Sequence, residues 1–261
     1  MQTSALIALF IALVLPADGA SAAKAERLVV SLSNHRVEIT SNFSGEQLVL
    51  FGSIEQDKNA PERAAGYDLV VTVTGPRRSY LTRLKTRVAG IWVNTESREF
   101  VDVPSYLAVL SNRPIDKIAR PDVLKRLQIG LDNFLLTQRI GPDLADTVHG
   151  DPFRRAFVRL KRKQHLYQQS QNAVTFLTST IFRSEVPLPA NVATGTYKVN
   201  VKLFSGGALI TETNSALEVI KTGFEQYVAE GAADYGLLYG VATILMALSI
   251  GWIASVMFRK D

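Results

Sequence analysis

Four residues that could bind a metal ion follow one another in a predicted loop: Asp143, Asp146, His149 and Asp151. Carboxylate and imidazole groups at such spacing can hold a hard or borderline cation. A solvated acidic loop is the simpler interpretation, because Asp151 directly precedes Pro152 and is placed to cap a helix. We therefore predict no metal site and no cofactor.

Most residue types used in catalysis are absent or isolated. The chain has no cysteine, which excludes thiolate metal sites, iron–sulfur clusters and cysteine nucleophiles. Of its three histidines, His35 lies in a predicted strand and His165 on a basic helix, and neither has an evident triad partner. The patterns of nucleophile elbows, Walker loops, zincins and dinucleotide folds are also missing. We expect no catalytic residue and a protein that is not an enzyme.

Basic side chains gather in two stretches without acidic residues, between Asp68 and Glu96 and between Asp151 and Glu185. The candidate contacts to an anion or to lipid headgroups are Arg77, Arg78, Arg154, Arg155, Arg159, Lys161, Arg162 and Lys163, and the first stretch also holds Arg83, Lys85 and Arg87. A helix packed on a sheet with a solvated basic face is the simpler interpretation. The functional interpretation is that these residues bind an anionic lipid surface or an acidic partner. Each basic residue near an anionic membrane surface contributes about 1 kcal/mol to binding.

The first residues are typical of a secretory signal. The apolar run of residues 5–15 is too short to cross a hydrocarbon core of about 30 Å. The small residues Ala20-Ser21-Ala22 fit a cleavage site, although no basic residue precedes the apolar run. We predict a signal peptide over residues 1–23, with an uncleaved, buried N-terminal helix as the alternative.

The other end of the chain predicts a transmembrane helix over residues 235–258. This segment carries no charge and would extend about 36 Å as a helix. A juxtamembrane helix over 224–234 precedes it, and the tail 259–261, with Arg259 and Lys260, is expected in the cytoplasm. Gly236 and Gly240 form a G-x-x-x-G notch for helix packing. A buried core helix of a soluble protein is the alternative.

Residues 24–223 are predicted to form an exported, β-rich domain. A hydrophobic content of 47% with 20% charged residues excludes a mainly disordered chain. Apolar–polar alternation predicts strands over 27–32, 35–40, 47–51, 67–74, 79–88, 89–94, 99–103, 174–182, 196–204, 208–213 and 216–220. The first two are expected to form a hairpin or to lie adjacent, and 205–207 to form a tight hairpin turn.

The pattern is helical near residues 104–170. We predict a short helix over 104–110, a second one beginning at Pro121, and a long one that Asp151 caps. One face of the long helix is expected to carry the apolar residues Phe153, Ala156, Phe157, Leu160 and Tyr167.

The predicted fold class is mainly β: an immunoglobulin-like β-sandwich with a central helical insertion, followed by a single C-terminal transmembrane helix. Tyr197 begins a strand where such sandwiches often use a tyrosine to pin the preceding corner. Two separate β domains flanking the helices are the alternative.

Four short motifs in order carry a resemblance to a known family: VVSL (29–32), FSGEQLVLFG (43–52), YDLVVTVTGP (67–76) and GIWVN (90–94). With them the chain resembles the alphaproteobacterial putative transmembrane protein family from about residue 25 to the last span. The resemblance implies a bacterial inner-membrane protein that faces the periplasm and an accessory role beside a sulfite-exporter-like permease. It supplies no active-site residues.

We therefore expect a single-pass inner-membrane protein with a periplasmic domain, acting as a non-catalytic accessory of a multispan membrane transporter or an envelope complex. The alternative is a periplasmic domain that binds an anion, a solute or lipid headgroups. A homo-oligomer is a further alternative. Despite the net charge of +5, we expect no nucleic acid as a partner of an exported domain.

Overall fold

The computed structural model describes residues 26–56, 66–140, 143–148, 150–223, 232 and 234–257. The predicted signal peptide (1–23), nearly all of the predicted juxtamembrane helix and the tail (259–261) lie outside these residues.

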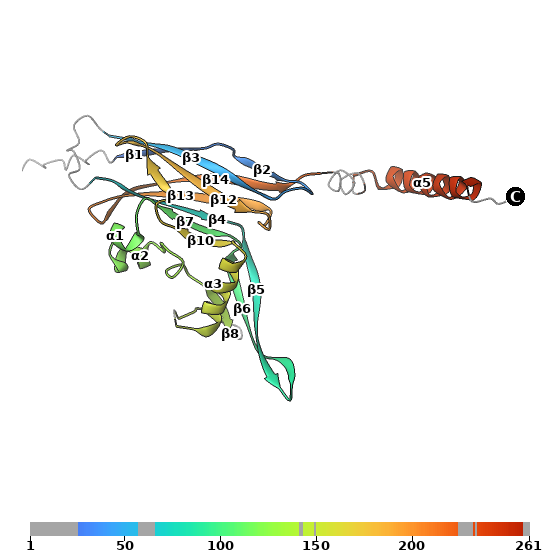
Figure 1. The fold of residues 1–261 in the computed structure, drawn as a ribbon, viewed down its shortest axis with the longest axis horizontal. Coiled ribbons are helices and arrows are strands. Elements are labelled where there is room, and N and C mark those ends of the chain that lie inside the picture. Colours follow the sequence, from blue (N-terminus) through green and yellow to red (C-terminus); the bar gives the residue numbers. More distant parts are fainter. Residues whose placement is uncertain are drawn as a thin grey trace, which may run out of the picture.

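The described chain is mainly β, as predicted (Figure 1). Its strands are β1 (Arg27–Leu32), β2 (Arg36–Ile39), β3 (Gly45–Glu55), β4 (Asp68–Thr74), β5 (Arg77–Val88), β6 (Ile91–Pro104), β7 (Leu107–Ser111), β8 (Thr137–Ile140), β9 (Asp143–Asp146), β10 (Tyr167–Ser170), β11 (Val174–Phe176), β12 (Ile181–Pro189), β13 (Gly195–Ser205) and β14 (Ala208–Lys221). Its helices are α1 (Ile115–Ile118), α2 (Pro121–Arg126), α3 (Pro152–Lys163) and α5 (Gly236–Met257).

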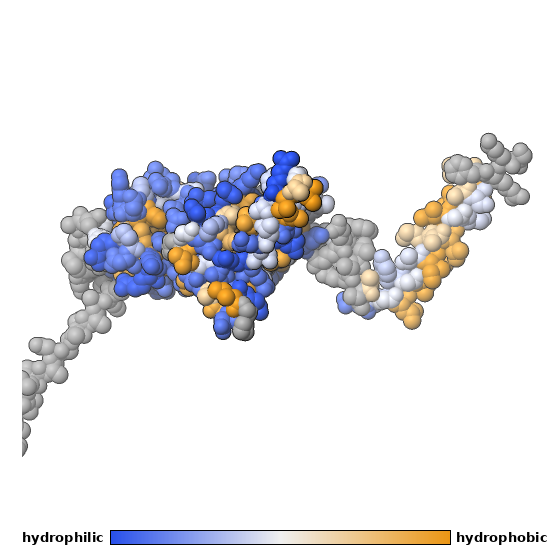
Figure 2. Space-filling view, turned by 90° about the horizontal axis from the view of Figure 1, so that it is seen from below, coloured by the Kyte–Doolittle hydropathy of each residue, from blue (hydrophilic) through white to orange (hydrophobic). Residues whose placement is uncertain are grey.

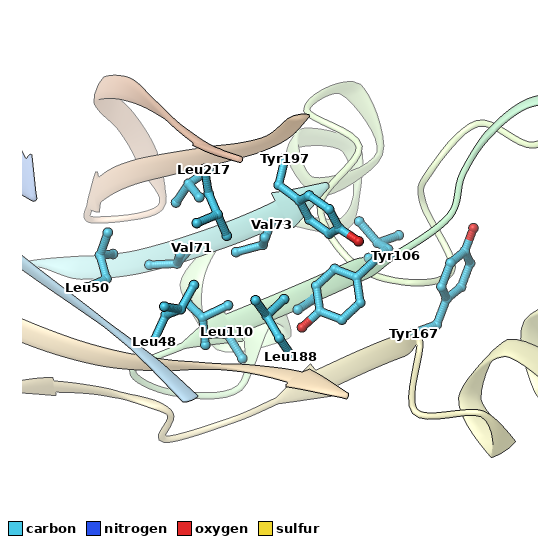
Figure 3. Close-up of a cluster of buried hydrophobic side chains, with 14 of the residues drawn as sticks. Leu48, Leu50, Val71, Val73, Tyr106, Leu110, Tyr167, Leu188, Tyr197 and Leu217 are labelled. Atoms are coloured by element: carbon cyan, nitrogen blue, oxygen red, sulfur yellow. The ribbon is translucent and has the colours of Figure 1, made fainter. Parts of the chain in front are cut away.

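Two sheets pack face to face. One has the strand order β1-β3-β12-β11 and the other β10-β7-β4-β13-β14-β2. Figure 3 shows Leu48 and Leu188 of the first sheet facing Val73 and Tyr197 of the second, and all four are buried. Strands from before and after the helices pair in both sheets, β3 with β12 and β4 with β13. This is one sandwich, which excludes two separate β domains.

β1 and β2 do not form the expected hairpin and are not neighbours. β1 pairs with β3 in the smaller sheet, whereas β2 pairs in parallel with β14 in the larger one. Both strands have the predicted alternation, with Leu28, Leu32 and Val37 buried. Alternation decides which face of a strand is buried but not which strand lies beside it.

The predicted helix over residues 104–110 is wrong, because β7 occupies this part of the chain. Every residue of β7 is buried, and the strand lies between β4 and β10. A strand buried on both faces has a continuous apolar sequence, which periodicity cannot separate from a buried helix. Helix α2, with Pro121 at its first position, confirms the second helix.

A two-stranded arm projects from the sandwich (Figure 1). β4 continues through Gly75-Pro76 into β5, and β6 returns through Ser105-Tyr106 into β7. Backbone pairing crosses the bend, since Gly75 N donates to Tyr106 O (2.9 Å) and Ser105 N donates to Pro76 O (2.9 Å). β5 and β6 form a third sheet with β8 and β9, in the order β5-β6-β8-β9.

Helix α3 confirms the predicted cap and, at Phe153 and Phe157, part of the predicted apolar face. The Asp151 carboxylate accepts hydrogen bonds from Phe153 N (2.7 Å) and Arg154 N (3.2 Å). The buried residues of the helix are Phe153, Arg154, Phe157 and Lys161. Leu160 is 50% exposed, and Tyr167 lies beyond the helix, in β10.

Two local predictions at the end of the domain are confirmed. β13 and β14 form the hairpin around Gly206-Gly207, and the Tyr197 hydroxyl donates to Ala193 O (2.7 Å), which pins the preceding corner. The immunoglobulin-like character of the sandwich stays a prediction.

Helix α5 lies within the segment predicted to cross the membrane. Its mean hydropathy over the most apolar window is 2.0, and none of that window is buried. Figure 2 shows the apolar residues along this helix. Among the residues that the structure describes, α5 is the helix that is long and apolar enough to span a bilayer.

Candidate functional site

The basic residues of α3 fall into an exposed and a buried set. Arg155, Arg159, Arg162 and Lys163 are exposed, whereas Arg154 and Lys161 are buried, with 3% and 6% of their surfaces accessible. The predicted set of eight contacts therefore has to lose these two, because a buried cation cannot meet an anionic surface.

Arg154 holds together the loops beneath α3. Its guanidinium donates to the carbonyl oxygens of Phe134 (2.6 Å) and Asp132 (3.2 Å) and to Thr147 Oγ1 (3.3 Å). Asp146 Oδ1 lies 3.9 Å from it. Burial lowers the pKa of Arg154, and the carboxylates of Asp146 and Asp132 oppose that shift. Its role is structural.

Lys161 lies in an aromatic box. Its Nζ is 3.7 Å from the ring centre of Tyr80, 5.6 Å from that of Phe157 and 6.0 Å from that of Tyr167. Ring faces attract a cation, which compensates in part for its lost hydration. Burial first, and then the charge of Arg78, lower the pKa of Lys161 to about 8.

We expect Lys161 to make the stability of the domain depend on alkaline pH. Because its pKa is about 8 in the folded state and 10.5 as the ordinary value, the unfolded chain holds the extra proton between these values, and stability rises with pH across this window. Lys161→Met should abolish this rise and be the more stable protein at pH 7. Urea unfolding of both proteins at pH 7 and pH 10 tests this; an equal change with pH in the two would contradict it.

The exposed arginines of α3 line a groove. Its volume is about 250 Å³, and its lining is Leu131, Asp132, Arg154, Arg155, Val158, Arg159 and Arg162. Arg155, Arg159 and Arg162 share one helix face, since they are four and then three positions apart. The lining contains one acidic residue, Asp132. Three guanidinium groups around a partly apolar groove provide the forked donors that phosphate, sulfate or carboxylate groups accept.

Arg77 and Arg78 do not line this groove. Arg77 lies at the base of the arm and donates to the carbonyl oxygen (2.7 Å) and the carboxylate (3.1 Å) of Asp102. Arg78 donates weakly to Thr194 O (3.5 Å). The two predicted basic stretches therefore do not form one groove, although Arg78 is close enough to Lys161 for its charge to act on that residue.

Two of the acidic residues considered for a metal have structural partners. Asp146 accepts from Leu136 N (2.9 Å), and Asp151 caps α3 and forms an ion pair with Arg98. Asp143 is exposed in β9, and His149 lies outside the described residues. Within the part of the chain that the structure describes, no three His, Cys, Asp or Glu side chains are grouped to hold a metal ion.

The glycine notch of α5 is open. A Cβ atom added to Gly236 or Gly240 would meet no atom within 4 Å. The notch therefore offers a place where a second helix can approach the backbone closely.

Sequence reasoning missed the exposed apolar residues at the end of the arm, Val88, Ile91, Trp92 and Val93. Their alternation alone does not distinguish them from ordinary strands of the sandwich. The absence of acidic residues from 69 to 95 is the one sequence signal that sets the arm apart.

A β-rich domain followed by an unburied apolar helix defines a membrane-anchored protein. The chain belongs to the family described as Putative transmembrane protein (Alph_Pro_TM), which matches residues 27–260. No curated protein matches the chain. A solved structure, the N-terminal domain of the Streptococcus gordonii adhesin Sgo0707, is similar at 8% identity and a TM-score of 0.27 over 74% of this chain and 32% of that one. The chain thus spans about a third of that structure.

Proposed function

We propose that this protein is a non-catalytic accessory subunit that docks on a multispan membrane protein through α5. The observation that supports the proposal is that α5 is unburied along its most apolar window and carries an open glycine notch at one end. In a bilayer, helices associate through close packing, for which small residues are needed.

The proposed location is the bacterial inner membrane, with the β-rich domain in the periplasm. The apolar run of residues 5–15 followed by Ala20-Ser21-Ala22 supports export of the domain. Arg259 and Lys260 support a cytoplasmic tail. A sulfite-exporter-like permease is the partner that the family resemblance favours.

A substitution in the notch tests the docking. Gly240→Ile should reduce recovery of the partner with the tagged full-length protein several-fold, because the added side chain keeps the two helix backbones apart. Ala242→Ile is the matched control, since it adds similar bulk about 200° around the helix. Equal recovery with both variants would contradict docking through the notch.

The groove on α3 favours a second function, binding of a sulfate-, sulfite- or phosphate-like anion, either free or as a lipid headgroup. Three arginines on one helix face around a groove of about 250 Å³ support it. Such a ligand binds the folded state and not the unfolded one. At a concentration of ten times Kd it therefore adds about 1.4 kcal/mol to the free energy of unfolding.

A thermal-melt screen tests this function. For a domain of this size, we expect a saturating anion to raise Tm by about 3–5 °C. Arg155→Ser with Arg159→Ser should remove the shift, whereas Lys163→Ser, outside the groove, should keep it. A Tm shift with soluble glycerophosphate indicates that the groove binds a lipid headgroup. A shift only with sulfite, sulfate or inorganic phosphate indicates that it binds a free anion. The absence of any shift at millimolar concentrations would exclude this function.

A further inference from the structure

The outer half of the β5–β6 arm has one apolar face without cover. Paired residues of two strands share a face, and the pairs Val88–Ile91 and Thr86–Val93 lie on the same face as Leu84. The exposed fractions are 44% for Leu84, 51% for Val88, 66% for Ile91 and 37% for Val93. This face also carries Thr86 and, opposite Leu84, the exposed Glu96, so its apolar part is the end of the hairpin around Val88, Ile91 and Val93.

The same face is covered at the base of the arm. Tyr80 pairs with Phe100 there, and their ring centres lie 5.6 and 5.1 Å from that of Phe157 in α3. In Figure 1 the arm extends well beyond α3. The apolar face therefore continues past the helix that buries it, which is the pattern of a surface that meets something outside the domain.

The opposite face of the outer half is basic. Arg83, Lys85 and Arg87 alternate along β5 and are exposed, and Trp92 lies opposite Arg87. Arg87 Nε donates to Gly90 O (3.2 Å) at the turn. The first acidic residues of the arm are Glu96, which lies opposite Leu84 on the other face, and Glu99, which forms an ion pair with Arg139 rather than with these three cations. Trp92 is 69% exposed.

We propose that the outer half of the arm inserts into the interface of an anionic phospholipid bilayer, the one that α5 crosses. Ile91 and Trp92 enter the boundary between headgroups and acyl chains, where an aromatic ring with a polar N–H is favoured. Arg83, Lys85 and Arg87 then meet lipid phosphates. An acidic protein surface would suit the charges but not the apolar strip on the other face.

The tether allows this contact. Residues 222–235 separate β14 from α5 and reach at most about 50 Å when extended. β5 alone, with 12 residues, is about 40 Å long. The predicted juxtamembrane helix over 224–234 makes this linker shorter than its extended limit, which keeps the domain closer to the bilayer, within the length of the arm.

Tryptophan fluorescence tests the proposal on the full-length chain. The chain has two tryptophans, so Trp252→Phe leaves Trp92 as the single reporter. The protein is reconstituted into vesicles of phosphatidylethanolamine and phosphatidylglycerol or into vesicles of phosphatidylcholine alone. We expect a blue-shifted emission and at least twofold quenching by brominated lipid in the anionic vesicles, and little of either in the neutral ones.

The charges are tested with a matched pair of variants in the same background. Arg83→Ser, Lys85→Ser and Arg87→Ser together should abolish the quenching. Lys117→Ser, Lys125→Ser and Arg126→Ser, which remove the same charge from the exposed surfaces of α1 and α2, should leave it unchanged. Equal thermal unfolding of both variants shows that the fold is intact.

Three results would overturn the proposal. Trp92 would be unquenched by lipid in both vesicles, or quenched equally in both. Alternatively, it would be shielded from aqueous acrylamide yet unquenched by lipid, which would mean that the arm contacts a protein, a second copy of the chain included.

Discussion

Arg154→Ala is expected to lower the free energy of unfolding by about 3 kcal/mol or more. The carbonyl oxygens of Phe134 and Asp132 lose the donor Arg154, and Thr147 Oγ1 loses the hydrogen bond that it accepts from the same guanidinium. A cavity remains where a nearly buried side chain packed 5.0 Å from the ring centre of Phe134. Both effects act at one point, the junction of α3 with the loops beneath it.

The neighbouring Arg155 is the matched control. It is exposed on the same helix, and Arg155→Ala should change stability by no more than about 0.5 kcal/mol. Urea unfolding of the full-length protein in detergent, followed by the circular dichroism of the sheets, measures both. Similar losses for the two variants would show that Arg154 is not the structural residue described above.

Gly52→Val is expected to prevent folding of the sandwich or to destabilise it by more than about 4 kcal/mol. Gly52 pairs directly with Phe182 across β3 and β12, and the ring of Phe182 lies over the glycine. A Cβ atom on Gly52 would be 2.2 Å from Phe182 Cζ. Phe182 has no exposed surface, so its ring is enclosed by the core and cannot turn out into solvent without opening the sandwich.

A double-mutant cycle identifies the cause of that loss. In Gly52→Ala with Phe182→Ala, the added methyl group no longer meets a ring, so the double variant should lose about 1–3 kcal/mol less than the sum of the single ones. Gly150→Ala is the control, because a Cβ atom there meets nothing within 4 Å. Additive losses would show that the close approach of ring and glycine is not the reason.

The sequence predicts the β-rich class, most strands and the unburied apolar helix, because each depends on local patterns. It does not predict strand partners: β1 and β2 follow one another but lie in different sheets. It also mistakes β7 for a helix, since a strand covered on both faces loses its alternation. These features depend on contacts between distant parts of the chain.

For the basic helix α3, too, the sequence predicts only part of the site. The sequence identifies the cluster of charge but not which cations are buried. Lys161 lies four positions after Phe157 and eight after Phe153, so helical periodicity alone places it on the buried face. A long aliphatic stem allows a basic residue to occupy such a position. A prediction of the buried face from apolar residues alone selects Leu160 instead, which is exposed.

Photo-crosslinking in the protein's own membranes tests the central claim most directly. A photoreactive amino acid replaces Ile244, on the same side of α5 as Gly240, or Ala242, on the other side. We expect one multispan membrane protein to be captured from position 244 and not from position 242, and Gly240→Ile to abolish the capture. Capture of nothing, or of another copy of this chain alone, would contradict docking of α5 on a membrane partner.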